Sequence, residues 1–514
     1  MKFNELINGL DLANLRGCLD TEVSDIDCDS REIKTGWGFI ALKGAAADGH
    51  DYIRQAIDKG AAAIFSEKEP PDASAKASAM FNAGSGLNSR EAMALLAQRV
   101  HGGPDRHLPL IGVTGTNGKT TTTMLIRQLL LASNMGCGLI GTVMNAAGNL
   151  EVEATRTSPE STTFYRWIKR SLNAEDAALA VEVSSHAMDL ARVYGAKFKV
   201  GVFTNLTQDH LDFHKNMEAY FRAKAKLFSQ CDIGLVNIED EYGRRLLSEN
   251  AGLISYGLDK GAYRAESLVL RHDGTSFTLQ TPKSRFYVNS PLLGRFNAYN
   301  LLAALSALDA AGFGLEKLLP NTIALKGAPG RLERIDLGQP FGVMVDYAHT
   351  PDALEKLLVA GKDLLTPGGR LHVLFGCGGD RDRSKRPIMA QAIVSGGADV
   401  IWHTSDNTRT EDPERMLNDA AAGIPEEIRD NPAVYHRIAD RALAVQAAIA
   451  DCRPGDLLLL AGKGHEPYQD VMGVKHPYSD RAAAEAALKG EYIPRPWASG
   501  TSSAHSDKPQ GASC

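Results

Sequence analysis

A glycine-rich loop between an apolar run and a helical pattern constrains the fold of this chain more than any other feature. The run LPLIGV at residues 108–113 leads into TGTNGKTTT, and the segment TTTMLIRQLLLA that follows has the apolar spacing of a helix. A buried strand that ends in such a loop and continues into a helix is typical of parallel α/β sheets. Loop N–H groups and a helix N-terminus together bind phosphate. The sequence therefore predicts an α/β domain that binds a nucleoside triphosphate.

The loop offers specific chemistry to that nucleotide. Lys119 supplies a point charge to the β- and γ-phosphates, and the hydroxyl of Thr120 can ligate Mg²⁺. The usual spacing places a glycine at position 113, where this chain has Val113, and the glycines are Gly112 and Gly115 instead. The strand, the Gly-Lys-Thr sequence and the helix still occur together, which favours the nucleotide interpretation. The predicted binding residues of the loop are Gly115, Thr116, Asn117, Gly118, Lys119, Thr120 and Thr121.

Length and pattern divide the chain into three α/β segments and a polar tail. At about 150 residues per domain, 514 residues correspond to about three domains. Apolar strands that end in polar loops recur in the middle and last segments. We therefore predict a central, phosphate-loop ATPase-like parallel sheet and a C-terminal doubly wound, Rossmann-like domain. The predicted boundaries are residues 1–107, 108–330 and 331–494, followed by a disordered tail at 495–514.

Composition excludes several classes of protein. The net charge of −6 gives no basis for binding nucleic acid. No apolar run reaches the roughly 20 residues of a membrane span, and the first residues lack the apolar core of a signal peptide. The seven cysteines are scattered without a CxxC pair, which is typical of reduced thiols. We therefore expect a cytoplasmic protein with no membrane span and no nucleic-acid partner.

Two polar residues follow neighbouring strands of the predicted central sheet. Glu182 follows ALAV, and His210 follows KVGVFTNL within TQDHLD. Both are expected at the sheet edge that carries the phosphate loop. Oxygen ligands suit Mg²⁺, and a histidine is acceptable beside carboxylates. Taken alone, Glu182 could equally be a helix cap or a buried ion-pair partner, and His210 an ordinary loop histidine.

An ordered series of motifs resembles the Mur ligase family. The motifs are GTNGKTTT, RTSPES, EVSSH, NLTQDHLDFH, YFRAKAKLF, GRFNAYNLLAA, PGRLERI, DYAHTPD, GCGGDRDRSKRP, SDNTRTEDP and AGKGHEPYQ, and the resemblance covers residues 25–490. It implies an ATP- and Mg²⁺-dependent ligase of peptidoglycan precursor synthesis. Within the family, the motifs are similar to members that join meso-diaminopimelate to the D-Glu γ-carboxylate of UDP-MurNAc-L-Ala-D-Glu through an acyl phosphate. The implied partners are ATP, this nucleotide dipeptide and meso-diaminopimelate, and we expect a monomer.

The resemblance also implies a catalytic centre. It assigns Glu182 and His210 to Mg²⁺ and gives Lys224 a CO₂-derived carbamate, an anionic group that binds a second Mg²⁺. A lysine beside cations loses its proton more readily. Without the family register, the choice between Lys224 and Lys226 stays open. The expected catalytic residues are Lys119, Lys224, His210 and Glu182, and the expected metal ligands are Thr120, Glu182, His210 and Lys224 as its carbamate.

Further residues match the family's contacts to its two nucleotide substrates. For ATP these are Asn297, Asn300, Arg331, Asp346 and His349. For the UDP-MurNAc-dipeptide they are Ser30, Thr157, Ser158, Ser184 and Arg192. Ser158 stands where a second threonine is usual and keeps the hydroxyl. The residues themselves also allow Asp346 to be a turn or helix cap and Arg192 to form a surface salt bridge.

The incoming amine is expected at the third domain. The stretch Asp406-Asn407-Thr408-Arg409 resembles the Asp-Asn-Pro-Arg motif of diaminopimelate-adding members, with threonine in place of proline. Arg409 can bind the distal carboxylate of diaminopimelate through two parallel hydrogen bonds. The same region also has a helix-start signal, Asp-Pro at 412–413, and both interpretations can hold. The remaining expected contacts are Arg381, Gly462 and Glu466, with Glu466 on the distal ammonium.

Three alternatives remain open from the sequence. The same reaction could use L-lysine, although Arg409 favours an amine with a distal carboxylate. A folylpolyglutamate-type ligase shares a related plan, but the DNTR loop and the DSR sequence of the first domain argue against it. A non-catalytic nucleotide-binding protein would not need Lys119, Glu182, His210 and Lys224 intact.

Overall fold

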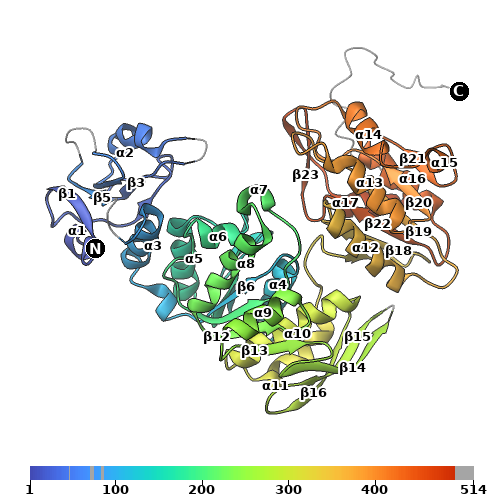
Figure 1. Ribbon diagram of the computed structural model, residues 1–514, viewed down its shortest axis with the longest axis horizontal. Coiled ribbons are helices and arrows are strands. Elements are labelled where there is room, and N and C mark those ends of the chain that lie inside the picture. The colour runs from blue at the N-terminus through green and yellow to red at the C-terminus, as the bar shows by residue number, and fades with distance from the viewer. Residues whose placement is uncertain (45–46, 70–74, 83–85, 272, 492–514) are drawn as a thin grey trace, which may run out of the picture. The chain divides into compact units, whose positions relative to one another are not determined.

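The computed structural model describes residues 1–44, 47–69, 75–82, 86–271 and 273–491. The chain divides into two compact units, shown in Figure 1. The first comprises Met1–Val269, Thr275–Pro291 and Phe296–Leu325, and the second comprises Leu270–Gly274, Leu292–Arg295 and Lys326–Cys514. The tail predicted at 495–514 lies outside the described residues.

The first sheet of the first unit has five strands in the part of the chain that is described. Its neighbouring strands run parallel, except that β1 is antiparallel to β5. The helix α3 (Ser89–Val100) begins with a capping box, in which Asn88 accepts backbone hydrogen bonds and Glu91 returns one. In spatial order the strands are β1 (Leu12–Gly17), β5 (Ala77–Phe81), β4 (Ala63–Ser66), β3 (Gly38–Ala41) and β2 (Ile26–Asp27).

The second sheet of this unit has eleven strands as far as the chain is described, and its centre is parallel. The middle strands are buried along their whole length, as expected for a parallel sheet covered by helices. In spatial order the strands are β16 (Arg285–Ser290), β15 (Gly274–Gln280), β14 (Tyr263–Arg271), β13 (Ile254–Gly257), β12 (Cys231–Asn237), β11 (Phe198–Phe203), β6 (Leu110–Thr114), β10 (Ala178–Glu182), β7 (Cys137–Ile140), β8 (Met144–Ala147) and β9 (Leu150–Glu153).

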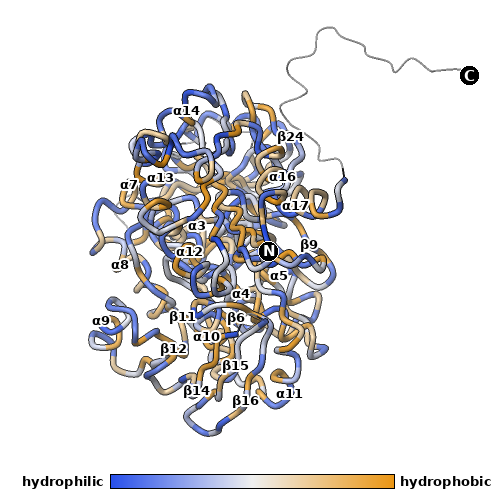
Figure 2. Tube along the Cα trace, turned by 90° about the vertical axis from the view of Figure 1, so that its right-hand side faces the viewer, coloured by the Kyte–Doolittle hydropathy of each residue, from blue (hydrophilic) through white to orange (hydrophobic). Residues whose placement is uncertain are grey.

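Helices accompany both sheets of the first unit. Figure 2 shows that apolar segments gather along the strands, whereas polar segments are more frequent on helices such as α9. Antiparallel pairs occur at both ends of the large sheet, and the sequence did not predict them. The helices are α1 (Phe3–Ile7), α2 (Ile53–Asp58), α3, α4 (Lys119–Ala132), α5 (Ser161–Asn173), α6 (Ser185–Asp189), α7 (Leu211–His214), α8 (Met217–Ala225), α9 (Glu241–Glu249), α10 (Arg295–Ala310) and α11 (Leu315–Leu318).

The second unit contains a six-stranded sheet, counted over its described residues, and a separate hairpin. All neighbours in the sheet are parallel except β17 and β18. In spatial order the strands are β17 (Glu333–Ile335), β18 (Gly342–Asp346), β22 (Leu457–Ala461), β19 (Leu371–Phe375), β20 (Val400–His403) and β21 (Tyr435–Arg437), and the hairpin is β23 (Tyr468–Val471) with β24 (Val474–Pro477).

Helices cover both faces of this sheet. Leu458 and Leu460 belong to a buried core with side chains of α16 (Arg441–Asp451) and α17 (Asp480–Lys489), whereas Leu459 lies against Gly361 of α12 (Pro351–Leu364). Because alternate residues of a strand face opposite sides, the sheet is packed on both faces. The predicted doubly wound α/β fold is therefore confirmed. The remaining helices are α13 (Lys385–Ser395), α14 (Pro413–Ala421) and α15 (Glu426–Arg429).

Among the described residues, no helix has the combination of length and apolar character that crossing a bilayer requires.

Candidate active site

The predicted phosphate loop connects β6 to α4. Gly118 has a φ of +87°, which side chains rarely adopt, and a Cβ at this position would lie 2.5 Å from Oδ1 of Asn300 on α10 and displace that side chain. Asn205, which follows β11, holds the other side of the loop. Its backbone carbonyl accepts from the Thr116 N–H, and its side-chain oxygen accepts from the Asn117 N–H, both at 2.9 Å. The loop is thus fixed by two neighbouring elements.

Lys119 bends back over the loop. Its Nζ donates to the carbonyl oxygens of Gly115 and Thr116, both at 2.9 Å. Thr120 and Thr121 follow in the first turn of α4 and are buried. The seven loop residues predicted from the sequence therefore lie in one strand–loop–helix turn.

Glu182 lies at the end of β10, which pairs with β6 and so brings its carboxylate beside the loop. Glu182 is 1% exposed. Its Oε2 accepts from the hydroxyls of Thr120 at 2.9 Å and Thr142 at 3.0 Å, and its Oε1 accepts from the Thr142 N–H at 2.7 Å. The hydroxyl of Thr142 in turn lies 3.0 Å from that of Thr157. Carboxylate and hydroxyl oxygens therefore converge at this edge, and they are ligands that Mg²⁺ prefers.

Lys224, in the last turn of α8, and Lys226, just after this helix, have different surroundings. Nζ of Lys224 is buried, donates to the Gly115 carbonyl at 2.7 Å and lies 4.6 Å from the centre of the Tyr220 ring. Burial, with the nearby charge of Lys119, holds the pKa of Lys224 well below its usual value. Nζ of Lys226 instead pairs with Asp189 at 2.6 Å, and its side chain is 54% exposed. Of the two, only Lys224 contacts the phosphate loop.

His210 immediately precedes α7, in the left-handed backbone region at a φ of 53°. Its Nε2 lies 3.4 Å from Oδ2 of Asp209. Its ring centre is 4.9 Å from that of His186 and 6.2 Å from that of Tyr220, whose hydroxyl is 3.3 Å from that of Thr116. Across the described ranges, no group of three or more His, Cys, Asp and Glu side chains could hold a metal. The predicted set of Mg²⁺ ligands would therefore need Thr120 and Lys224 in addition to Glu182 and His210.

Several residues assigned to the dipeptide substrate interact with each other. Ser158 donates to the Glu182 carbonyl at 2.8 Å, and its hydroxyl lies 3.2 Å from that of Ser184, which caps α6. Arg192 donates to the Ser158 carbonyl at 3.0 Å and to Glu160 at 2.9 Å. Burial lowers the pKa of Arg192. Thr157 joins the set through Thr142.

The other predicted nucleotide contacts are spread over several elements. Ser30, in the region of the first sheet, donates to Oε1 of Gln55 at 2.7 Å. Asn300 donates to Oδ1 of Asn297 at 3.4 Å, both on one face of α10, as their spacing predicts.

In the second unit, Asp346 ends β18, and its carboxylate accepts from the N–H groups of Leu332 at 2.7 Å and Ala348 at 2.8 Å. Burial raises the pKa of Asp346. The guanidinium of Arg331 lies 4.8 Å from the centre of the Tyr347 ring, and Nδ1 of His349 is 2.7 Å from the Tyr347 carbonyl. Through these contacts Asp346 caps the turn after β18. This is the structural role that the sequence allowed for Asp346 beside nucleotide binding.

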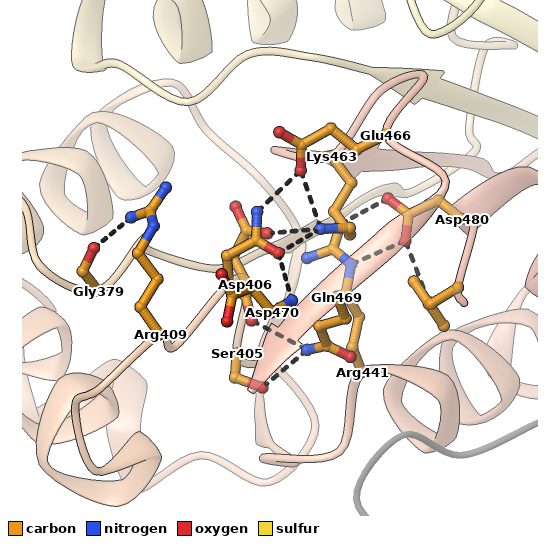
Figure 3. Close-up of polar contacts among 12 residues, drawn as sticks. Gly379, Ser405, Asp406, Arg409, Arg441, Lys463, Glu466, Gln469, Asp470 and Asp480 are labelled. Carbon is orange, nitrogen blue, oxygen red and sulfur yellow. Dashed lines mark hydrogen bonds and ion pairs between the residues drawn. The ribbon is translucent and has the colours of Figure 1, made fainter. Parts of the chain in front are cut away.

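Most residues predicted for the amine follow β20 and β22, and Figure 3 shows Asp406, Arg409 and Glu466 among them. Asp406 and Asn407 follow β20, and Glu466 follows β22. The Asn407 amide donates to Oε2 of Glu466 at 2.8 Å. Lys463, which the sequence analysis did not single out, contacts all three through its Nζ, at 3.2 Å from Asp406, 3.0 Å from Asn407 and 3.0 Å from Glu466.

Arg409 is held in the left-handed region, at a φ of 51°. Its N–H donates to the Asp470 carbonyl at 3.0 Å, and its carbonyl accepts from the Gly473 N–H at 3.1 Å, so the β23–β24 hairpin fixes its backbone. Its guanidinium donates to the Gly379 carbonyl, as Figure 3 shows. Thr408, before it, is fully buried.

Arg381 is exposed in the loop after β19. Gly462 follows β22 and has a φ of +115°, and a Cβ there would lie 3.4 Å from Oδ2 of Asp406.

Sequence reasoning missed several residues that support these sites. Thr142 was not singled out, although it makes two hydrogen bonds to Glu182. His214 was not either, although its Nε2 lies 2.8 Å from the Ser185 hydroxyl and its Nδ1 3.2 Å from Asp189. Lys463 lies within the quoted AGKGHE motif, and that position was the only available signal.

Three family models match most of the chain. They are "Mur ligase family, catalytic domain" at residues 22–101, "Mur ligase middle domain" at 113–308 and "Mur ligase, glutamate ligase domain" at 330–464.

Among curated proteins, the UDP-N-acetylmuramoyl-L-alanyl-D-glutamate–2,6-diaminopimelate ligase of Bacillus licheniformis is 39% identical over 500 residues, covering 95% of this chain and 99% of that protein. The protein of the same name from Nostoc sp. is 42% identical over 505 residues, with the same coverage. A solved structure of a protein of this name is 32% identical, with a TM-score of 0.66 over 95% of this chain and 99% of that one. MurF ligase of Thermotoga maritima, solved with ADP, is 19% identical and shares the fold, with a TM-score of 0.59 over 91% and 96%.

Proposed function

Because this chain belongs to the Mur ligase family, we propose that it is an ATP-dependent ligase that adds meso-diaminopimelate to UDP-MurNAc-L-Ala-D-Glu in peptidoglycan precursor synthesis. The new amide joins the D-Glu γ-carboxylate to an amine of diaminopimelate. The observation that carries the choice of amine is the placement of two opposite charges in this region: Glu466 is hydrogen-bonded to Asn407, and Arg409, two residues after Asn407, rests on the Gly379 carbonyl. A guanidinium and a carboxylate at one sheet edge suit the carboxylate and the ammonium of an amino acid's end.

The phosphate loop would bind ATP for in-line transfer of its γ-phosphate. An oxygen of the D-Glu γ-carboxylate attacks the γ-phosphorus, the bond to the ADP oxygen breaks, and an acyl phosphate forms. Lys119 and the N-terminus of α4 stabilise the charge that develops on the phosphate oxygens. The amine nitrogen then attacks the acyl carbon, the carbon–oxygen bond to phosphate breaks, and the nitrogen loses a proton. The products are the amide, ADP and phosphate.

Mg²⁺ is the cofactor that the residues around Glu182 fit. The Glu182 carboxylate and the Thr120 hydroxyl lie 2.9 Å apart and are both oxygen ligands. When bound, the metal neutralises phosphate charge and orients the reacting oxygens. We propose His210 as a further ligand. Its side chain is 48% exposed beside the Tyr220 ring, so it is accessible to a cation.

We further propose that Lys224 carries a carbamate. The nitrogen of a neutral amine bonds to the carbon of CO₂ and releases one proton to solvent, which leaves an anionic carbamate, whereas an ammonium has no lone pair to do so. Burial of Lys224 lowers its pKa and so favours the neutral amine. The resulting carbamate would offer oxygen ligands beside the Gly115 end of the phosphate loop.

The acceptor dipeptide would bind beside Glu182. Ser158 and Ser184 present hydroxyls there, and Arg192 is a cation whose position Glu160 and Ser158 fix. A guanidinium of this kind pairs with phosphate or carboxylate. We propose that the reaction occurs in the cytoplasm and that the enzyme acts as a monomer.

Phosphate release with defined substrates tests the proposal. The purified protein is given ATP and Mg²⁺ in three separate reactions. Two contain UDP-MurNAc-L-Ala-D-Glu, one with meso-diaminopimelate and one with L-lysine. The third contains a reduced folate and L-glutamate. Phosphate release and a product mass increased by one diaminopimelate residue are expected only with meso-diaminopimelate. Equal turnover with L-lysine would assign the lysine-adding reaction, and turnover with the folate pair would assign a folylpolyglutamate-type ligase.

A further inference from the structure

A buried lysine lies between the two carboxylates of the amine site. Lys463, in the loop after β22, is 0% exposed. Its Nζ is 3.2 Å from Oδ1 of Asp406, 3.0 Å from Oδ1 of Asn407 and 3.0 Å from Oε2 of Glu466. An ammonium has three N–H donors, and these three acceptors use all of them. Lys463 therefore has no hydrogen-bonding capacity left for a substrate and serves the protein's own side chains.

Glu466 presents one oxygen to the protein and one away from it. Its Oε2 accepts from both Lys463 and Asn407. Within the described part of the chain, no donor bonds its Oε1, and the side chain is 20% exposed. Figure 3 shows this second oxygen pointing away from Lys463. An incoming ammonium can therefore bind Oε1 without displacing any bond that holds the glutamate.

The formal charges of Asp406, Glu466 and Lys463 can be balanced by one more cation. Asp406 and Glu466 contribute two negative charges and Lys463 one positive charge, so the cluster carries one net negative charge. Buried charges are stable only when they are paired and hydrogen-bonded. One substrate ammonium would balance this cluster, as one substrate carboxylate would balance Arg409.

The surrounding structure holds Asp406 and Asn407 in place. Gln469 donates to the Asp406 carbonyl at 2.9 Å, and the N–H of Asp470 donates to Oδ1 of Asn407 at 2.8 Å. Behind the cluster, Arg441 donates to the Ala461 carbonyl at 2.9 Å and forms a fully buried ion pair with Asp480 (Figure 3). The Glu466 N–H donates to the Lys463 carbonyl at 3.0 Å, but among the described residues the Glu466 carboxylate is hydrogen-bonded only by the side chains of Lys463 and Asn407.

We infer that Lys463 is a positioning and specificity-determining residue of the amine site. It orients Glu466 so that Oε1 faces the distal ammonium of the substrate, and it sets the net charge of the Asp406–Lys463–Glu466 cluster to accept one ammonium. The inference rests on the proposed function, since it takes the amine to be an amino acid with a second ammonium.

Removing the charge should loosen Glu466 and leave two carboxylates close together. They would then recruit a proton or a solvent cation, and either competes with the substrate ammonium. The sites for ATP and for the dipeptide do not involve Lys463, so binding of these substrates should not change.

The test is steady-state kinetics of Lys463→Met in the full chain, with each substrate varied in turn. We expect KM for meso-diaminopimelate to rise at least about tenfold, with KM for ATP and for the dipeptide within about twofold of wild type. Lys463→Gln keeps hydrogen-bond donors in the buried position, so it provides the same test if the methionine variant does not fold. Lys475→Met is the matched control, because Lys475 is exposed over the Tyr468 ring of the neighbouring hairpin, and its KM values should not change.

A double-mutant cycle distinguishes positioning from a general structural effect. If Lys463 acts through Glu466, then Lys463→Met should raise KM for diaminopimelate less than about threefold when Glu466→Gln is already present. The same rise in both backgrounds, an unchanged KM in the single variant, or a parallel rise in all three KM values would overturn the inference. Absence of diaminopimelate turnover in the wild type would instead overturn the proposed function.

Discussion

Nζ of Lys224 lies 2.7 Å from the carbonyl oxygen of Gly115, so this buried amine contacts the first residue of the phosphate loop. Lys226, two residues later, forms a surface ion pair with Asp189. Two lysines at the C-terminal end of α8 thus have opposite surroundings, and this contrast provides a direct test of the carbamate assignment.

We expect Lys224→Ala to lower kcat at least about 100-fold while ATP still binds, because the metal would lose an anionic ligand but the loop would keep its phosphate contacts. The kcat of Lys226→Ala should stay within about twofold of wild type, since exposed ion pairs contribute little. The measurements are kcat and the ATP dissociation constant of both variants. Added formate or acetate should restore part of the activity of Lys224→Ala. Near-normal turnover of that variant, or an equal loss in Lys226→Ala, would contradict the assignment.

Lys119→Ala and Glu182→Ala should both remove most activity, but through different steps. Each loss should cost on the order of 2–4 kcal/mol in the transition state. Glu182 and Thr120 would hold the metal, so raising Mg²⁺ should recover part of the Glu182→Ala activity. Lys119 acts on the phosphates, so raising Mg²⁺ should not recover the activity of Lys119→Ala. Activity of each variant is measured as a function of Mg²⁺ concentration, and equal recovery of the two would show that their roles are not separate.

The elements that the sequence predicted well are those with local signals. The apolar run, the glycines and the helical pattern around residue 115 gave β6, the loop and α4 in the observed order. Asp412 caps α14 and Pro413 is its first residue, as the start signal predicts. The β15–β16 pair and the β23–β24 hairpin were missed, because strand pairing depends on tertiary partners more than on local preference.

In the candidate site too, residues with a local sequence signal were predicted and those that depend on tertiary contacts were not. Family motifs located Glu182 and Glu466, but each is held by a residue that is remote in sequence. Thr142 is 40 positions from Glu182, and Asn407 is 59 positions from Glu466. The choice between Lys224 and Lys226 likewise depends on burial, which the charge pattern of one helix does not reveal.

Glu411 should make the second unit sensitive to acid. Its Oε1 accepts from the buried Arg386 at 2.7 Å and from the Asp380 N–H at 2.6 Å. The hydrogen bond from Arg386 is the largest cause that lowers the pKa of Glu411 from 4.5 to about 2. Because the pKa is lower in the folded state, its stabilising contribution is present above about pH 4.5 and is lost as the pH falls towards 2. This shift corresponds to at most about 3 kcal/mol, and screening by solvent reduces it.

Urea unfolding of Glu411→Gln and wild type between about pH 7 and pH 3 checks this expectation. The variant should be less stable near neutral pH, and the difference should shrink below about pH 4.5, because the carboxyl of the unfolded wild-type chain takes up a proton there while the folded one stays ionised until about pH 2. Glu414→Gln is the control, because Glu414 is mostly exposed in its ion pair with Arg437. A difference in stability that does not depend on pH would show that Glu411 does not act through its charge.

The choice of amine should depend on Arg409. We expect the enzyme to prefer meso-diaminopimelate to L-lysine, because only diaminopimelate has a distal carboxylate for this guanidinium. With lysine bound, Arg409 would be enclosed without a carboxylate partner, which is costly. Sites built around a polar group typically reject an analogue that lacks it by about 10⁴-fold in kcat/KM. Thr408 replaces the family's proline, but Asp470 and Gly473 hydrogen-bond to the Arg409 backbone and so supply rigidity that a proline would otherwise give.

The measurement is kcat/KM for both amines in wild type, Arg409→Ala and Arg415→Ala. Arg409→Ala should lose selectivity mainly by losing diaminopimelate turnover, since L-lysine makes no carboxylate contact that the substitution could remove. Arg415 is exposed on α14, so Arg415→Ala should keep the wild-type ratio. The guanidinium of Arg409 donates from Nη1 to the Gly379 carbonyl, and a guanidinium has five N–H donors, so it can bind a carboxylate while it keeps this bond. Hydrogen bonds to an ionised acceptor are stronger than those to a neutral one, which favours a substrate that has the carboxylate. A wild-type enzyme that used both amines equally would show that this arginine does not set the choice.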